Sequence, residues 1–81
     1  FYERYREASE KNMMLSVSYL VNNYYSNEDY IPICDLYFKS YDYGLFKYGN
    51  FGTLLRIGNS LKKVGLANYA INHFRKMINK F

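Results

Sequence analysis

The chain has 81 residues and a net charge of +4; 49% of its residues are hydrophobic and 21% are aromatic. This length allows one small domain over residues 1–81, and one proline with five glycines argues against a disordered or linker-rich chain. No apolar run is long enough for a membrane span or a secretory signal, and a single cysteine excludes an internal disulfide. We therefore expect an intracellular protein, in the nucleus or cytoplasm, and interpret the start at Phe1 as that of an excised domain or processed fragment.

Two helices are predicted in the first half of the chain. Apolar residues recur at helical spacing over about residues 10–25, and residues 3–11 before them are typical of an exposed first turn or extension. Pro32 stands where a second helix can begin, because a missing N–H costs nothing in the first turn. Gly44 is a plausible stop for that helix.

The second half is expected to hold two more helices. Asn50 is suited to cap the first of these, which ends or bends at Gly58-Asn59. Residues 59–68 are compatible with either a short helix or one strand of a small hairpin. Asn68 is the expected N-cap of the last helix, which is the most clearly periodic segment of the chain.

Together these elements predict a mainly α fold: a compact bundle of about four helices with a helix-turn-helix core, and room for a winged-helix hairpin around 59–68. The predicted core consists of Leu15, Val17, Leu20, Val21, Leu36, Tyr37, Phe51, Leu54, Leu55, Ile71, Phe74 and Ile78.

The sequence offers little for catalysis or for a cofactor. Cys34 and His73 form the only available nucleophile and base, and nothing in the sequence places them together. We expect Cys34 beside the core and His73 at the surface. Four nitrogen or sulfur ligands at metal-site spacing are missing, so we predict neither an enzyme, a metal site, a cofactor nor a small-molecule substrate.

Charge is divided unevenly along the chain. Residues 1–42 hold seven acids and four bases, a net of −3, whereas residues 43–81 hold seven bases and no acid, a net of +7. A surface of one sign attracts polyanions, and nucleic acid is the first of these. In the last helix, Asn72, Arg75, Lys76, Asn79 and Lys80 recur at i, i+3, i+4, i+7 and i+8, so they share one face. Arg and Lys neutralise phosphates, and Asn can read adenine.

Part of the chain resembles the DNA-binding domain of the RFX family, a winged-helix fold. The resemblance covers residues 19–56 and rests on Tyr19-Leu20, Asn23-Tyr24, Ile31-Pro32, Leu36-Tyr37, Asp42-Tyr43 and Phe51-Gly52-Thr53-Leu54-Leu55-Arg56. It implies that the helix starting at Phe51 faces the DNA groove. Only Lys62-Lys63-Val64-Gly65 is similar to the family's basic wing, so Arg56, Lys62 and Lys63 are the contacts that it implies.

A second resemblance, to the AT-rich interaction (ARID) domain, rests on landmarks nearer the end of the chain. They are Asp35-Leu36-Tyr37, Gly49-Asn50-Phe51, Val64-Gly65-Leu66, His73-Phe74-Arg75-Lys76 and Phe81. This family is all-helical, and the chain lacks its central tryptophan. Both resemblances imply a DNA binder of helix-turn-helix type.

The resulting hypothesis is a domain that binds double-stranded DNA, within a larger protein of transcription or replication. The expected contacts are Lys47, Arg56, Lys62, Lys63, Asn72, Arg75, Lys76, Asn79 and Lys80. The alternative is a helical protein-interaction module, viral or from a parasite, with a basic, tyrosine-rich surface. The residues leave open whether the basic face prefers DNA, RNA or an acidic protein.

Overall fold

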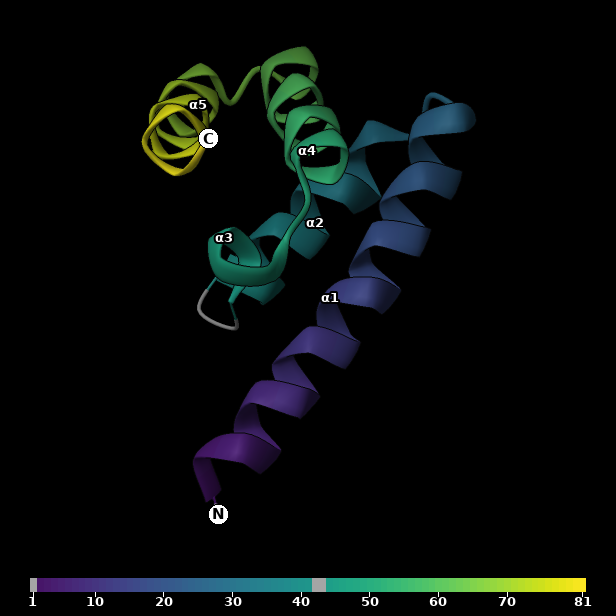
Figure 1. Ribbon diagram of the computed structural model, residues 1–81. Coiled ribbons are helices and arrows are strands. Elements are labelled where there is room, and N and C mark those ends of the chain that lie inside the picture. Colours follow the sequence, from purple (N-terminus) through teal and green to yellow (C-terminus); the bar gives the residue numbers. More distant parts are fainter. Residues whose placement is uncertain (1, 42–43) are drawn as a thin grey trace.

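Five helices make up the described part of the chain. The computed structural model describes the backbone of residues 2–41 and 44–81, and the side chains of these ranges from Ala8 onward. In chain order the helices are α1 (Tyr2–Ser26), α2 (Tyr30–Ser40), α3 (Leu45–Tyr48), α4 (Phe51–Val64) and α5 (Ala67–Lys80) (Figure 1). Across 2–41 and 44–81 no residue lies in a β-strand. The predicted mainly α domain of about four helices is confirmed, since four of the five described helices are longer than one turn.

The helices are arranged around α4. Helices α1 and α2 pack against each other and both contact α4, while α5 packs on α4 and also touches α3. Figure 1 shows α4 between α1 and α5, with the first turns of α1 extending beyond the other helices. Helix α3 is a single turn that leads the chain from α2 into α4. Most of the second half of the chain therefore lies in two adjacent helices, α4 and α5.

The core uses a different set of side chains from the predicted one. Val17, Val21, Tyr37 and Leu54 are buried as expected, and Leu36 and Phe74 are half-buried against the core. The expectation is wrong for six residues that are exposed, namely Leu15, Leu20, Phe51, Leu55, Ile71 and Ile78. Their places are taken by Met14, Ile33, Cys34, Leu45, Ile57, Leu61, Ala70 and Met77.

Helix α4 does not end or bend at Gly58, and the hairpin proposed for 59–68 is absent. Those residues instead complete α4, turn at Gly65 and start α5. Gly58 lies where α5 approaches most closely: a Cβ there would stand 2.6 Å from Cζ of Phe74 and 3.0 Å from Cδ2 of His73. The missing side chain thus serves helix packing. The helix stops at Gly65, whose φ of 94° is accessible to glycine at little cost.

The two predicted N-caps have different outcomes. The Asn50 side chain accepts a hydrogen bond from the Thr53 amide at 2.8 Å, so this cap is confirmed. Asn68 is not a cap, because α5 begins one residue earlier and Leu66 precedes it without a side-chain bond. Of the RFX-type landmarks, Asp42 and Tyr43 lie outside the described residues.

Candidate nucleic-acid interface

The fold keeps the two signs of charge on different helices. Helices α3, α4 and α5 carry every lysine and arginine after residue 43 and no carboxylate. The carboxylates whose side chains are described belong to α1, α2 and the turn between them: Glu10, Glu28, Asp29 and Asp35. Because α4 packs on α5 and α5 on α3, the basic helices form one contiguous half of the molecule.

A polar and basic stripe runs along α4. Gly52, Arg56, Asn59 and Lys63 follow one another at i, i+4, i+7 and i+11, which places them on the same side of a continuous helix. The stripe lies outside the buried set of α4; Lys63 is exposed, and Arg56 and Asn59 are half-buried. The sequence hypothesis omitted Asn59 because it ended or bent the helix there. The spacing from Gly52 to Lys63 is the signal that could have found it.

The predicted polar face of α5 divides into two parts. Asn72, Arg75 and Asn79 are exposed and lie on the side of α5 opposite its buried stripe of Ala70, His73 and Met77. Within the described part of the chain, Arg75 has no ion-pair partner.

Lys76 and Lys80 turn instead toward α3. The Lys76 ammonium stands 4.1 Å from the centre of the Tyr41 ring and 5.2 Å from that of Phe46, while Lys80 Nζ donates a hydrogen bond to the Gly49 carbonyl at 2.9 Å. Both side chains remain exposed, but these contacts restrain them.

Two other predicted cations also lie close to aromatic rings. Lys47 Nζ is 5.1 Å from the Tyr48 ring centre, and Lys63 Nζ is 5.2 Å from that of Tyr30. A cation over a ring face is attracted by the ring quadrupole and keeps its charge. Lys47, Lys76 and Lys80 thereby gather around α3, whereas Arg56 and Lys63 belong to the α4 stripe. Lys62 is exposed on another side of α4.

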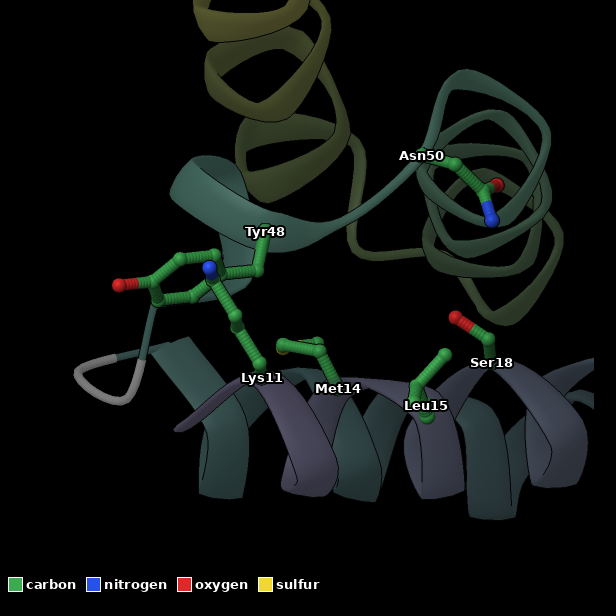
Figure 2. Close-up of a pocket in the computed structure, with 6 residues that line it drawn as sticks. All are labelled: Lys11, Met14, Leu15, Ser18, Tyr48 and Asn50. Atoms are coloured by element: carbon green, nitrogen blue, oxygen red, sulfur yellow. The ribbon is translucent and has the colours of Figure 1, made fainter. Parts of the chain in front are cut away.

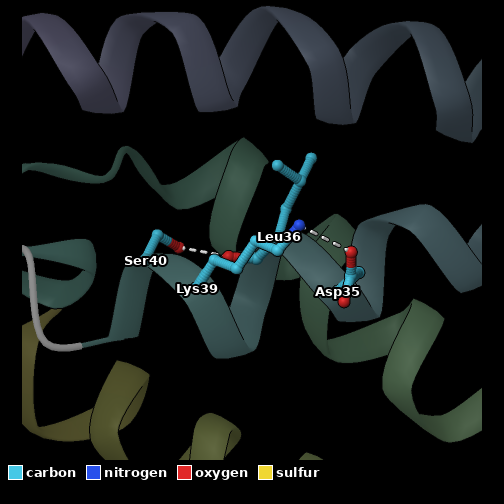
Figure 3. Close-up of polar contacts among 4 residues, drawn as sticks. All are labelled: Asp35, Leu36, Lys39 and Ser40. Atoms are coloured by element: carbon cyan, nitrogen blue, oxygen red, sulfur yellow. Dashed lines mark hydrogen bonds and ion pairs between the residues drawn. The ribbon is translucent and has the colours of Figure 1, made fainter.

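A carboxylate lies close to the α3 end of this surface. Glu10 Oε2 stands 3.3 Å from where a Cβ on Gly44 would be, at the start of α3. The field around α3 is therefore weaker than that around α4 and α5, which makes these two helices the better candidates for polyanion contact. Polar side chains of α2 bond within the helix itself. Lys39 Nζ pairs with Asp35 at 3.1 Å, and the Ser40 hydroxyl donates to the Leu36 carbonyl (Figure 3).

An open pocket lies between α1 and the segment that joins α3 to α4. Figure 2 shows Lys11, Met14, Leu15 and Ser18 of α1 facing Tyr48 and Asn50 across a space of about 320 Å³. The Lys11 ammonium is 5.7 Å from the Tyr48 ring centre. Apart from Lys11 the lining of this pocket holds no charged group, so the pocket adds one cation beside α3.

The expected surface position of His73 is wrong. The imidazole is fully buried among the rings of Tyr37, Phe46 and Phe74, and its Nε2–H donates to the Leu54 carbonyl at 2.6 Å. Burial lowers the pKa of His73 below its ordinary value, against the opposing effect of the bond to Leu54. Within the described residues Nδ1 has no partner. His73 thus joins α5 to α4.

Cys34 is buried as well, and burial raises the pKa of its thiol. Over 2–41 and 44–81, no three His, Cys, Asp or Glu side chains are grouped so that they could hold a metal ion. The helices described here include none with the length and apolar character needed to cross a membrane.

Comparison with protein-family models, with curated proteins and with solved structures found no match. The resemblances to RFX and ARID domains therefore rest on the sequence landmarks alone.

Proposed function

We propose that this domain binds double-stranded DNA through α4 and α5. The observation that carries the proposal is the absence of any carboxylate side chain from residues 44–81, which fold into three helices bearing seven cations, with α5 in contact with both α3 and α4. A surface with cations and no acids releases condensed counterions when it meets phosphates, and this release dominates DNA affinity.

The stripe on α4 has dimensions suited to the major groove. Arg56 and Lys63 are seven residues apart, or about 10 Å along the helix axis, and the major groove is about 12 Å wide. Arg56 can bond two acceptors of guanine and Asn59 two groups of adenine, while Lys63 neutralises a phosphate. Gly52, in the first turn of α4, leaves room for the sugar-phosphate backbone to approach.

Helix α5 supplies further phosphate contacts. Arg75 is the cation of α5 that is free to reach a phosphate without giving up a contact with a described residue. Lys76 and Lys80 are held against Tyr41, Phe46 and Gly49, so they present charge from fixed positions. Asn72 and Asn79 lie on the same exposed face as Arg75 and are its polar neighbours there.

Fluorescence anisotropy with a labelled mixed-sequence duplex tests the proposal. We expect Arg75→Glu with Lys76→Glu to abolish binding while the circular dichroism spectrum stays that of a folded helical protein. Both residues are exposed, and the spectrum checks that loss of the Lys76 contacts with the Tyr41 and Phe46 rings leaves the helices folded. Unchanged affinity in this double variant would exclude α5 from the interface.

A matched pair of single variants separates local contact from net charge. Lys63→Gln and Lys39→Gln each remove one positive charge, but Lys63 belongs to the α4 stripe and Lys39 is paired with Asp35 on α2. We expect only Lys63→Gln to reduce the slope of log affinity against log salt, by about one for one lost phosphate contact. Equal effects of the two would mean that the domain attracts DNA through net charge alone.

A further inference from the structure

An apolar groove separates α4 from the end of α5. It has a volume of about 510 Å³ and is lined by Phe51, Leu55, Phe74, Met77, Ile78 and Phe81. Ile78 is 76% exposed, Phe81 60% and Phe51 53%, so the walls of the groove are apolar side chains that no described residue covers. Phe51 and Phe81 meet edge to face, with ring centres 5.5 Å apart.

The groove arises from the way α5 packs. The buried stripe of α5 is Ala70, His73 and Met77, because the His73 ring reaches the Leu54 carbonyl and Gly58 lets Phe74 approach α4. The more apolar stripe beside it, which includes Ile71 and Ile78, is thereby turned away from the core and toward solvent. Exposed apolar side chains gathered in this way are typical of interaction sites.

The charges around the groove define what it can accept. Lys62 lies two turns after Leu55 on the same side of α4, and Arg75 lies on α5 between Ile71 and Ile78. Neither helix carries a carboxylate. The groove is thus an apolar site on two helices that carry only cations, with Lys62 exposed two turns beyond Leu55 on α4.

We propose that this groove binds an amphipathic helix of a partner protein, with apolar residues at i, i+3 or i+4 and i+7 and acidic residues on the flanks. Phe74, Ile78 and Phe81 span about 10 Å along α5, which matches two turns of such a helix. Acidic flanks are attracted by the cations of α4 and α5, among which Lys62 and Arg75 are exposed. A second copy of this chain is a poorer occupant, because a symmetric pairing would bring together the helices α4 and α5 of both copies, which carry cations and no carboxylate.

The probe for the test is a labelled synthetic peptide of about 16 residues with this apolar spacing and glutamates on its polar face. A scrambled peptide of identical composition is its control. We expect saturable binding of the patterned peptide and at least tenfold weaker binding of the scrambled one, as loss of central apolar anchors costs about that much or more. Equal binding of the two peptides would overturn the proposal, since it would show only charge attraction.

Matched protein variants locate the site. Ile78→Ser and Ile31→Ser remove the same side chain at similar exposure, 76% and 71%, but Ile31 is on α2 outside the groove. We expect Ile78→Ser to weaken the patterned peptide by at least about tenfold and Ile31→Ser to leave its binding unchanged. Because neither substitution alters charge, both variants retain whatever DNA binding the parent shows, so the groove and the DNA surface are tested separately.

Two other outcomes would assign the groove to a different occupant and overturn the proposal. One is a dimer in sedimentation velocity that Ile78→Ser dissociates, without peptide binding. The other is cosedimentation with phosphatidylserine vesicles that Ile78→Ser abolishes, again without peptide binding.

Discussion

The packing of α5 on α4 depends on Gly58, and Gly58→Ala tests that dependence. An alanine Cβ would stand 2.6 and 2.7 Å from two carbons of the Phe74 ring and 3.0 Å from the His73 ring. Overpacking of this kind costs about 1–3 kcal/mol, whereas exchanging glycine for alanine inside a helix gains about 1 kcal/mol. Steric overlap with two ring side chains should prevail, so we expect Gly58→Ala to lower the free energy of unfolding by up to about 2 kcal/mol.

Gly52→Ala in the same helix is the matched control. Its Cβ would meet Nη1 of Arg56 at 3.1 Å, the end of a flexible side chain that can move aside. We expect Gly52→Ala to be neutral or up to about 1 kcal/mol more stable than the parent. Thermal unfolding followed by far-ultraviolet circular dichroism resolves both, since about 1 kcal/mol moves the Tm of a domain this size by about 4–8 °C. A Gly58→Ala variant as stable as Gly52→Ala would refute the close packing of α5 against α4.

Three further predictions concern the cap, the buried histidine and the buried thiol. Asn50→Ala should cost about 1 kcal/mol in urea unfolding by removing the acceptor for the Thr53 amide, and no loss would argue against the cap. Burial lowers the pKa of His73 in the folded state, so the unfolded chain takes up a proton first as pH falls. Stability should therefore be greatest above about pH 6.5 and decline below it, and His73→Gln should lose that part of the decline; identical pH slopes in the two proteins would contradict this. Cys34 should react with a thiol reagent much more slowly in the folded protein than in urea, and equal rates would contradict its burial.

Helical periodicity and turn chemistry were enough to predict that the four longer helices exist and that Asn50 is a cap, but not the short helix α3 or the continuation of α4 beyond Gly58. They could not choose between two neighbouring stripes on α5. Hydrophobicity favours the stripe with Ile71 and Ile78, but the structure buries the one with His73, because a carbonyl on α4 satisfies its Nε2–H. That pairing joins residues 19 positions apart and has no local signal in the sequence.

Glycine gave a similar ambiguity on α4. Gly58 and Gly65 both look like helix stops, yet only Gly65 has a positive φ, and Gly58 serves a close helix approach. The distribution of charge along the sequence was enough to predict the basic residues of the candidate site. It was not enough to predict Asn59, because the place of Asn59 beside Arg56 depends on the helix continuing through Gly58.

The central hypothesis is that the acid-free helices α4 and α5 bind duplex DNA. The most direct measurement is the affinity for a labelled mixed-sequence duplex at about 50 mM and 200 mM salt, repeated with Arg75→Glu and Lys76→Glu. Our account predicts binding that weakens steeply with salt, by about one unit of log-log slope per phosphate contacted, and that disappears in the double variant. No binding at the lower salt concentration would contradict it.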